Sequence, residues 1–323
     1  MIGSSCYVFY YHGGYIIIYA RLLIIVNKWS SGSLMLIFGC GYLGERLAFR
    51  WREMGNPTHT VARRTQRLNE LKAAGFSPIL ADVTRPETLC HLPPAETVVF
   101  GVARNRELGD SWHATYVSGL SAVLDAVSNT VRRFIYISSS GVYGQKDGSW
   151  VDEQSPCHPA TEGGKYCWEA EQCLAQHPVG KRSIVVRLAG IYGPGRVPRR
   201  QALSNRQTIK AARQGFVNLI HVDDAVEAIV AAANSENLPS IYNVSDGHPV
   251  KREDYFRELC RLYHLSEPTF AAPDPDSAAA LRSASNKRLN NARLLNELGV
   301  TLRFPDYCEG LANIVATERG DVS

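Results

Sequence analysis

The sequence predicts an α/β protein with a doubly wound parallel sheet, and three observations support this prediction. A short apolar run at residues 35–38 leads into Gly39, Gly41 and Gly44, which have the spacing Gly-x-Gly-x-x-Gly. Apolar runs then alternate with stretches whose apolar residues recur at helical spacing, an order typical of strands and crossover helices. With 45% hydrophobic and 20% charged residues in a chain of 323, the composition is that of a globular protein able to bury a core.

The predicted strands and helices follow one another along most of the chain. Strands are expected at residues 35–38, 58–64, 77–83, 96–103, 133–138, 183–188 and 241–244. Helices are expected at residues 45–51, 66–74, 112–127, 164–176 and 225–233, the last with an Asp as its N-cap. The tail is expected to hold a helix at 254–263, a Pro/Ala-rich loop at 268–280 and a short helix at 291–298.

This order predicts three parts of the chain. Residues 35–189 and 217–247 are expected to form the domain of the parallel sheet. Residues 190–216, which are irregular and rich in Gly, Pro and Arg, are expected to form a smaller substrate lobe with residues 248–323. This lobe would cover the carboxyl edge of the sheet, where such folds bind their ligands. Residues 1–34 are placed outside the fold.

The N-terminal segment has three explanations. Residues 6–26 are apolar and about long enough to cross a bilayer, but Arg21, His12 and the Gly13-Gly14 pair make a poor membrane helix. The segment also lacks the basic start and small-residue cleavage site of a signal peptide. Because Met35 directly opens the first strand, we favour translation from an upstream start over a membrane anchor or a docked appendage.

The glycine spacing predicts a dinucleotide site because each glycine has a mechanical role. Gly39 allows a tight turn, Gly41 lets the backbone approach a pyrophosphate, and Gly44 lets the helix pack closely against the strand. The helix that begins near Tyr42 and Leu43 is expected to direct its free N–H groups and positive dipole end towards the phosphates.

Two arginines decide the expected cofactor. An NAD-specific site of this kind places Asp or Glu after the second strand, where the carboxylate holds the ribose 2′-OH. Here that strand ends in Arg63 and Arg64, and no acid follows until Glu70. A guanidinium in this position would pair with a 2′-phosphate. The expected cofactor is therefore NADP, with NAD the less favoured alternative.

Charge and cysteine content exclude other classes of protein. A formal net charge of +4, with scattered Lys and Arg, gives no basic stripe for nucleic acid. The eight cysteines include no Cys-x-x-Cys pair and no His/Cys cluster, which argues against a zinc site and a disulfide framework. Reduced thiols in a cytoplasmic protein are the expected state, and no metal is expected.

A series of motifs in a fixed order resembles one family. They are Gly-Cys-Gly-Tyr-Leu-Gly at 39–44, Asp-Val at 82–83, Ser-Ser-Ser-Gly-Val-Tyr-Gly at 138–144, Arg-Leu-Ala-Gly-Ile-Tyr-Gly-Pro-Gly at 187–195, His-Val-Asp-Asp at 221–224 and Tyr-Asn-Val-Ser-Asp at 242–246. Together they resemble an extended short-chain dehydrogenase/reductase of the NAD-dependent epimerase/dehydratase type, over roughly residues 35–315.

The resemblance implies a Rossmann-type fold, a nicotinamide cofactor and particular site residues. Asp82 and Val83 would belong to the cofactor site. Ser139 would bind a substrate hydroxyl or carbonyl, and Tyr143 would lie on the substrate side. The implied partner is a small molecule, such as a nucleotide sugar or a small carbonyl compound.

The chain departs from the family at its catalytic pair. The family carries Tyr-x-x-x-Lys on the helix after the Val-Tyr-Gly loop, with the Tyr as acid/base and the Lys lowering its pKa. When residues 159–171 are aligned on Pro159 and Glu171, the Tyr position is Gly163 and the Lys position is Cys167. Tyr166 lies one turn from Gly163 and could act instead, but its i+4 residue is an alanine, so no lysine supports it.

Other residues are weaker candidates. His221, at a strand end, could act on the substrate or make a structural bond. Arg196, after Gly-Pro-Gly, could bind an anionic substrate or be a solvated loop residue. Asp224 is expected to cap a helix rather than to catalyse. Two functional classes therefore stay open. One is an oxidoreductase or epimerase-like enzyme with a non-standard acid/base, and the other is an NADP-binding sensor or partner-binding protein with little turnover.

Overall fold

The computed structural model describes residues 7–11, 14–19, 22–27 and 33–320, apart from residues 106, 108 and 276. The first three of these segments are the strands β1 (Tyr7–Tyr11), β2 (Gly14–Tyr19) and β3 (Leu22–Asn27), which form an antiparallel sheet of their own. No helix in the described part of the chain is long and apolar enough to cross a membrane. The origin of residues 1–34 stays a prediction.

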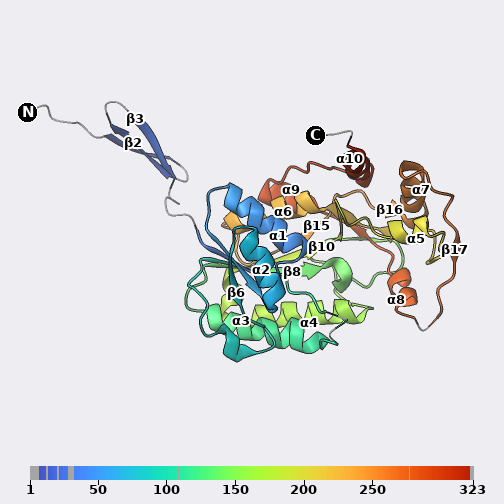
Figure 1. Ribbon diagram of the computed structural model, residues 1–323, viewed down its shortest axis with the longest axis horizontal. Coiled ribbons are helices and arrows are strands. Elements are labelled where there is room, and N and C mark those ends of the chain that lie inside the picture. The colour runs from blue at the N-terminus through green and yellow to red at the C-terminus, as the bar shows by residue number, and fades with distance from the viewer. Residues whose placement is uncertain are drawn as a thin grey trace, which may run out of the picture.

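A seven-stranded sheet, parallel at every pairing, is the centre of the molecule (Figure 1). Its spatial order is β15-β10-β8-β7-β4-β5-β6. Chain order runs outwards from β4 to β6 and then, from β7, outwards in the opposite direction, which confirms the predicted doubly wound fold. The strands are β4 (Met35–Phe38), β5 (Thr58–Ala62), β6 (Ser77–Leu80), β7 (Thr97–Phe100), β8 (Arg133–Ser139), β10 (Ser183–Leu188) and β15 (Ser240–Val244).

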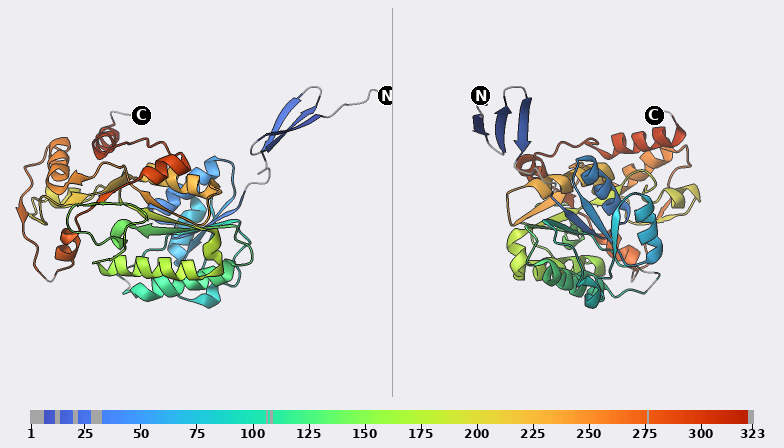
Figure 2. Two further views of the ribbon diagram at one scale, coloured as in Figure 1. Left: turned by 180° about the vertical axis from the view of Figure 1, so that it is seen from behind. Right: turned by 60° about the vertical axis from the view of Figure 1, so that its left-hand side comes forward.

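Helices cover both faces of this sheet, which is why its central strands are apolar throughout (Figure 2). Met35 and Ile37 pack in one buried cluster with residues of α1 (Tyr42–Glu53), α2 (Thr65–Ala73) and α6 (Val222–Asn234). Leu36 and Phe38 pack in another with residues of α3 (Gly119–Val127) and α4 (Glu162–Gln176). Alternate residues of β4 therefore contribute to opposite cores.

A third buried cluster lies outside the sheet and combines residues between Tyr192 and Leu219 with residues between Val250 and Ile314. Figure 1 shows its helices towards the right of the picture, while α2 lies further left. The helices of this part and of the tail are α5 (Arg200–Ser204), α7 (Arg252–Leu262), α8 (Ala278–Ala284), α9 (Ala292–Leu298) and α10 (Tyr307–Arg319). The short strands form pairs of two, namely β11 (Gly190–Tyr192) with β14 (Leu219–His221), β12 (Ile209–Lys210) with β17 (Phe270–Ala271), β13 (Phe216–Val217) with β16 (Val250–Lys251), and β9 (Trp150–Val151) with β18 (Arg288–Leu289).

The structure differs from the sequence prediction in several places, since the short helices α5 and α8 were also not expected. The helix expected at 112–127 is interrupted by a π-helical turn, Ala114–Ser118, before α3. The helix α10 was not predicted. The N-cap of α6 is His221, whose ring nitrogen accepts the N–H of Asp223, so the expected Asp cap was wrong. Asp224 instead accepts the backbone N–H groups of Arg303 and Phe304.

Candidate functional site

The turn between β4 and α1 has the geometry that its glycines predict. Gly39 has φ +90°, and a Cβ atom there would lie 2.3 Å from the carbonyl oxygen of Gly101. A Cβ atom at Gly44 would lie 2.5 Å from the carbonyl oxygen of Gly39. Both positions therefore accept only glycine. Gly41 differs, because no atom lies within 4 Å of the position its Cβ would take. No neighbouring atom therefore covers the backbone on this side of Gly41.

A cleft of about 880 Å³ lies at the carboxyl ends of the strands, next to this turn. The N-cap of α1 is Gly41, so no side chain satisfies the first N–H groups of the helix. These N–H groups can donate hydrogen bonds to an anion. The lining includes the turn residues Gly39, Gly41, Tyr42, Leu43 and Gly44, the strand-end residues Arg63, Arg64, Asp82, Val83, Ser138 and Ser139, and also Arg67, Arg104, Tyr116, Cys167 and Arg196.

The arginines after β5 are more constrained than the sequence indicates. Arg63 forms an ion pair of 2.9 Å with Asp110, whose pKa is lowered chiefly by this hydrogen bond. Arg64 is exposed. Arg67 pairs with Glu45 and Glu70 and also donates to the carbonyl oxygen of Cys40 in the glycine turn. Arg64 is thus the guanidinium of this group that an added anion could most easily recruit.

Asp82 and Val83, which follow β6, also line the cleft. One carboxylate oxygen of Asp82 accepts both the backbone N–H and the hydroxyl of Thr84, at 2.9 and 2.8 Å. Val83 is buried and lies against Gly119, where a Cβ atom would come within 2.8 Å of the valine side chain. The Asp82–Thr84 turn therefore fixes the lining that follows β6, the strand next to β5 and Arg63.

Tyr42 joins the glycine turn to the loop after β11. Its hydroxyl donates to the carbonyl oxygen of Pro194 at 3.0 Å. The guanidinium groups of Arg46 and Arg196 lie over its ring, 4.0 and 5.4 Å from the centroid. Arg196 is thus exposed and lines the cleft, and its guanidinium lies over the ring of a residue of the turn.

Gly163 and Cys167, the two positions that the sequence alignment assigns to the catalytic pair, have different surroundings. A Cβ atom at Gly163 would lie 3.0 Å from the indole of Trp112, so any side chain there requires the indole to move. Cys167 is buried and lines the cleft. Burial raises the pKa of its thiol to about 12, so the reactive thiolate is not formed near neutral pH.

Two tyrosines lie near these positions, on either side of Trp112. Tyr166 stacks on the indole at 6.2 Å with an interplanar angle of 6°, and it is not among the residues that line the cleft. Tyr116 contacts the indole at 5.3 Å and does line the cleft, together with Ser139 and Cys167. It lies in the π-helical turn that interrupts the helix, a feature often found at functional sites. The structure therefore brings Tyr116, rather than Tyr166, to the predicted site.

Ser139 ends β8, where its hydroxyl accepts the backbone N–H of Gly141 at 3.0 Å. Any serine at the end of a strand can make this structural contact. The hydroxyl can still donate its own hydrogen to a ligand, since Ser139 lines the cleft.

Behind Ser139 lies a buried polar network. Arg187 and Glu171 form an ion pair of 2.6 Å with side chains only 2% and 3% exposed. The Ser138 hydroxyl donates to Glu171 at 2.5 Å, and Arg187 donates to the Tyr143 hydroxyl at 2.8 Å. Tyr143 in turn donates to Asn243 at 2.9 Å. The hydroxyl of Tyr143 is therefore fully engaged inside the protein, and burial raises its pKa to about 12.

His221 is buried and is not part of the cleft lining. Its Nδ1 atom caps α6, and its ring packs between Tyr192 and Phe304, at 5.3 and 4.0 Å. Burial lowers the pKa of the imidazole to about 4, so the ring is neutral at physiological pH. The structure gives His221 the structural contact that was one of its two expected roles.

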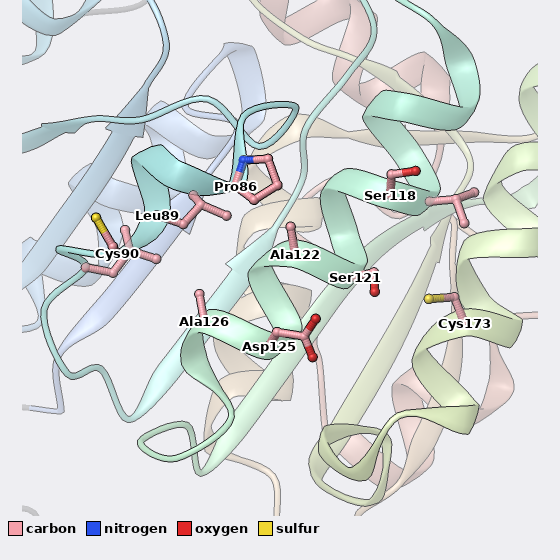
Figure 3. A pocket seen from close by; sticks show the side chains of 11 residues that line it. Pro86, Leu89, Cys90, Ser118, Ser121, Ala122, Asp125, Ala126 and Cys173 are labelled. Atoms are coloured by element: carbon pink, nitrogen blue, oxygen red, sulfur yellow. The ribbon is translucent and has the colours of Figure 1, made fainter.

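Figure 3 shows a separate hollow of about 760 Å³ between α3, α4 and the 3-10 turn Pro86–Leu89. It shares no lining residue with the cleft, and Asp125 is the only charged residue in its described lining. Within the described residues, no group of three or more His, Cys, Asp or Glu side chains could hold a metal ion. The cleft at the strand ends is therefore the candidate site.

Comparison with known proteins agrees with this geometry. The model of the NAD dependent epimerase/dehydratase family matches residues 35–245. The chain belongs to this family. It is 32% identical over 285 residues to the protein YeeZ of Escherichia coli K12, covering 84% of this chain and 96% of the relative.

Two solved structures of the family's fold are similar over nearly their whole length. One, from Methylobacillus flagellatus and assigned as an NAD-dependent epimerase/dehydratase, is 33% identical with a TM-score of 0.72, covering 89% of this chain and 99% of that chain. The other, a conserved protein of unknown function from Silicibacter pomeroyi, is 28% identical with a TM-score of 0.71, covering 88% and 99%.

Sequence reasoning missed Arg67 and Tyr116, which line the cleft, and Asp110, which pairs with the lining residue Arg63. Arg67 lies on α2 and reaches back to the glycine turn, and Asp110 and Tyr116 come from a segment without a motif. A signal existed only for Tyr116, which lies in the stretch of helical spacing at 112–127. The contacts that bring these side chains to the cleft are set by the tertiary fold.

Proposed function

We propose that the cleft binds a nicotinamide dinucleotide and that the chain acts on a small-molecule substrate as an oxidoreductase or epimerase-like enzyme. The observation that carries the proposal is the glycine turn, where Gly39 and Gly44 exclude side chains and Gly41 leaves the backbone open beside the start of α1. That cradle fits a pyrophosphate. When bound, the cofactor supplies hydride transfer, a reaction for which side chains alone have no equivalent.

We propose NADP(H) as the preferred form. Arg64 is the exposed guanidinium at the edge of the cleft, and Arg63 is available if the 2′-phosphate displaces Asp110. Asp110 also opposes this preference, because its carboxylate would repel the phosphate. Structures that share this fold contain NAD, among them MoeE5 and WbmG at about a fifth of identical residues, which makes NAD the alternative.

The proposed chemistry uses two side chains at the other end of the cleft. Ser139 would donate a hydrogen bond to a substrate hydroxyl or carbonyl. The phenol oxygen of Tyr116 would give or take the proton in place of the tyrosine that is absent at Gly163. MoeE5 binds UDP-glucose and UDP-glucuronic acid together with NAD, which supports a nucleotide sugar as one substrate class and leaves small carbonyl compounds as the other.

A binding protein with little turnover is the second candidate function. The observation in its favour is the exchange of the catalytic pair for Gly163 and Cys167, together with the indole of Trp112 against the first position. The described cysteines are all free thiols, which supports a cytoplasmic location for either function.

The test begins with calorimetric titration of NADPH and NADH into the full chain. NADPH oxidation is then followed against nucleotide sugars and small carbonyl compounds. Binding with turnover that falls in Tyr116→Phe supports the enzyme. Binding without turnover on any compound supports the sensor, and absence of binding by both nucleotides refutes the proposal.

A further inference from the structure

Residues 303–306, the segment that leads into α10, are held by side chains from three separate parts of the sheet domain. Asp224 of α6 accepts two of the segment's backbone N–H groups, at 2.7 and 3.0 Å. The hydroxyl of Tyr192 and the Nδ1 atom of His248 donate to two of its carbonyl oxygens, at 3.4 and 2.7 Å. None of these three side chains is part of the described lining of the cleft. They form a junction between the sheet domain and the tail.

Asp246, the last residue of the sequence motif at 242–246, lies inside this junction and is only 3% exposed. Its Oδ1 atom accepts the N–H of His248 at 3.0 Å. Its Oδ2 atom is buried and has no hydrogen-bond partner among the described residues. An ionised carboxylate in such a place is costly, because nothing replaces the water that it loses. The junction therefore accepts the protonated form of Asp246 better than the ionised form.

The ionisable side chains around Asp246 come from β11, β14, α6, the start of α10 and its own loop, and they are Tyr192, His221, Asp224, Asp306 and His248. Burial is the largest effect on Asp246 and raises its pKa. The carboxylates of Asp306 and Asp224 raise it further, whereas the N–H and the ring of His248 lower it, and the resulting pKa is about 7. Asp246 therefore gains or loses its proton near neutral pH.

Loss of this proton acts on the tail through charge repulsion. Both carboxylates that raise the pKa of Asp246 also hold the tail, Asp224 through its two N–H contacts and Asp306 as the N-cap of α10. The helix has no space to move inwards, since a Cβ atom at Gly310 would lie 2.1 Å from the hydroxyl oxygen of Tyr192. A third negative charge is therefore relieved by movement of the tail away from the sheet domain.

We propose that Asp246 is a proton-operated latch for residues 303–319. With its proton bound, the tail docks against β11, β14 and α6, and loss of the proton loosens it. Since Leu311 and Ile314 of α10 share a buried cluster with residues of α7, the latch links pH to the packing of the smaller cluster of helices. This inference goes beyond the proposed function, because neither cofactor nor substrate takes part in it.

The sign of the pH dependence follows from the two states of the latch. Release returns water to the carboxyl of Asp246, so the docked state binds the proton more tightly than the released state does. Docking is therefore most stable in acid, weakens as the pH rises from 3.8 to about 7, and changes no further above that range.

The test is amide hydrogen exchange of the full chain at pH 6 and pH 8, corrected for the intrinsic exchange rate at each pH. Protection of α10 in the unmodified chain should fall about tenfold between these values, as a buried group with a pKa of about 7 loses its proton. Protection of α3, which packs in a different buried cluster, should not change and serves as the internal reference.

Two variants assign the effect to Asp246. Asp246→Asn keeps an acceptor for the N–H of His248 but cannot ionise, so the protection of its α10 should agree at both pH values within about twofold. Asp223→Asn is the matched control, because it neutralises a carboxylate of the same helix whose side chain is 45% exposed. This control should keep the fall seen in the unmodified chain.

The outcomes separate the latch from other causes. A fall that persists in Asp246→Asn assigns the titration to His248 and overturns the proposal, as does unchanged protection in the unmodified chain. An equal fall in α3 shows loss of the whole fold and also overturns it. Should Asp246→Asn fail to fold, infrared titration of the unmodified chain decides. The carbonyl band of a protonated carboxylic acid should disappear with the same midpoint as the protection of α10, and absence of that band at pH 6 refutes the latch.

Discussion

The two ends of the cleft are built in different ways. At the cofactor end, main-chain geometry sets the shape, because Gly39 and Gly44 exclude side chains and Gly41 exposes the start of α1. At the proposed substrate end, side chains from distant segments line the cleft, with Tyr116 and Cys167 beside Ser139 and the Glu171–Arg187 pair behind it. A local motif is therefore sufficient to describe the first end and says little about the second.

This difference also bears on the prediction from the sequence that the chain keeps a cofactor turn and lacks the usual pair on α4. Gly39 and Gly44 are needed for the local fold of the turn, because a Cβ atom at either would meet the backbone, whereas Gly41 is open. The tyrosine position on α4 instead faces the indole of Trp112, and that indole fills the space which a side chain at Gly163 would need.

The largest expected effect tests the buried network of the substrate end. Glu171→Ala should lower the free energy of unfolding by about 3–5 kcal/mol, because Arg187 is left as an unpaired buried charge. Urea denaturation measures this change. Glu169→Ala, at an exposed glutamate on the same helix, is the control and should change stability by less than about 0.5 kcal/mol. Equal effects of the two substitutions would show that the network does not support this end.

The second prediction separates the two tyrosines beside Trp112. Tyr116→Phe should lower kcat about 100-fold, the lower range for loss of a general acid or base. Tyr166→Phe should change kcat less than twofold or so, since its ring stacks on the indole outside the cleft. Steady-state rates on any substrate found by the NADPH assay measure both. A large loss in Tyr166→Phe alone would return the acid/base role to α4.

The sequence predicted the sheet well because its signals are local. All seven strands were expected within a few residues, since each is a short apolar run, and alternate residues of β4 indeed enter opposite cores. The helix α10 was missed because its buried residues are few, with Leu311, Ile314 and Val315 among them, and mostly polar residues separate them. The Asp cap of α6 was wrong because His221 competes for the same N–H groups.

The candidate site was predictable only in part, for the same physical reason. The spacing of Gly39, Gly41 and Gly44 predicts the geometry of their turn. Tyr116 reaches the cleft, and Asp110 reaches Arg63, only through the tertiary fold, from a segment that carries no motif of its own. Arg252 and Lys287 line a second cavity of about 460 Å³ together with Ser139, but they lie far from it in sequence and were not expected near it.

The third prediction tests whether backbone shape alone builds the cofactor end. Gly41→Val should weaken NADPH binding about 100-fold, or about 2.7 kcal/mol, because the new side chain lies where the pyrophosphate would approach. Stability should change little, since φ at Gly41 is −99° and no atom lies near its Cβ position. Calorimetry and thermal unfolding measure the two quantities. Undiminished binding would refute the pyrophosphate assignment.

The smallest expected effect concerns the choice between NADP and NAD, and it tests the part of the cofactor end that side chains do set. Arg64→Ala should reduce the ratio of NADPH to NADH affinity about tenfold, or about 1.4 kcal/mol, by removing the exposed guanidinium. Asp110→Asn should change the ratio in the opposite direction, because it frees Arg63 from its ion pair and removes a negative charge near the expected phosphate. Arg85→Ala, an exposed arginine outside the cleft, serves as the control. Titration of both nucleotides into each variant gives the ratios. If neither Arg64→Ala nor Asp110→Asn alters the ratio, the arginines after β5 do not select the cofactor, and the carboxylate beside Arg63 becomes the better candidate for holding a ribose hydroxyl of NAD.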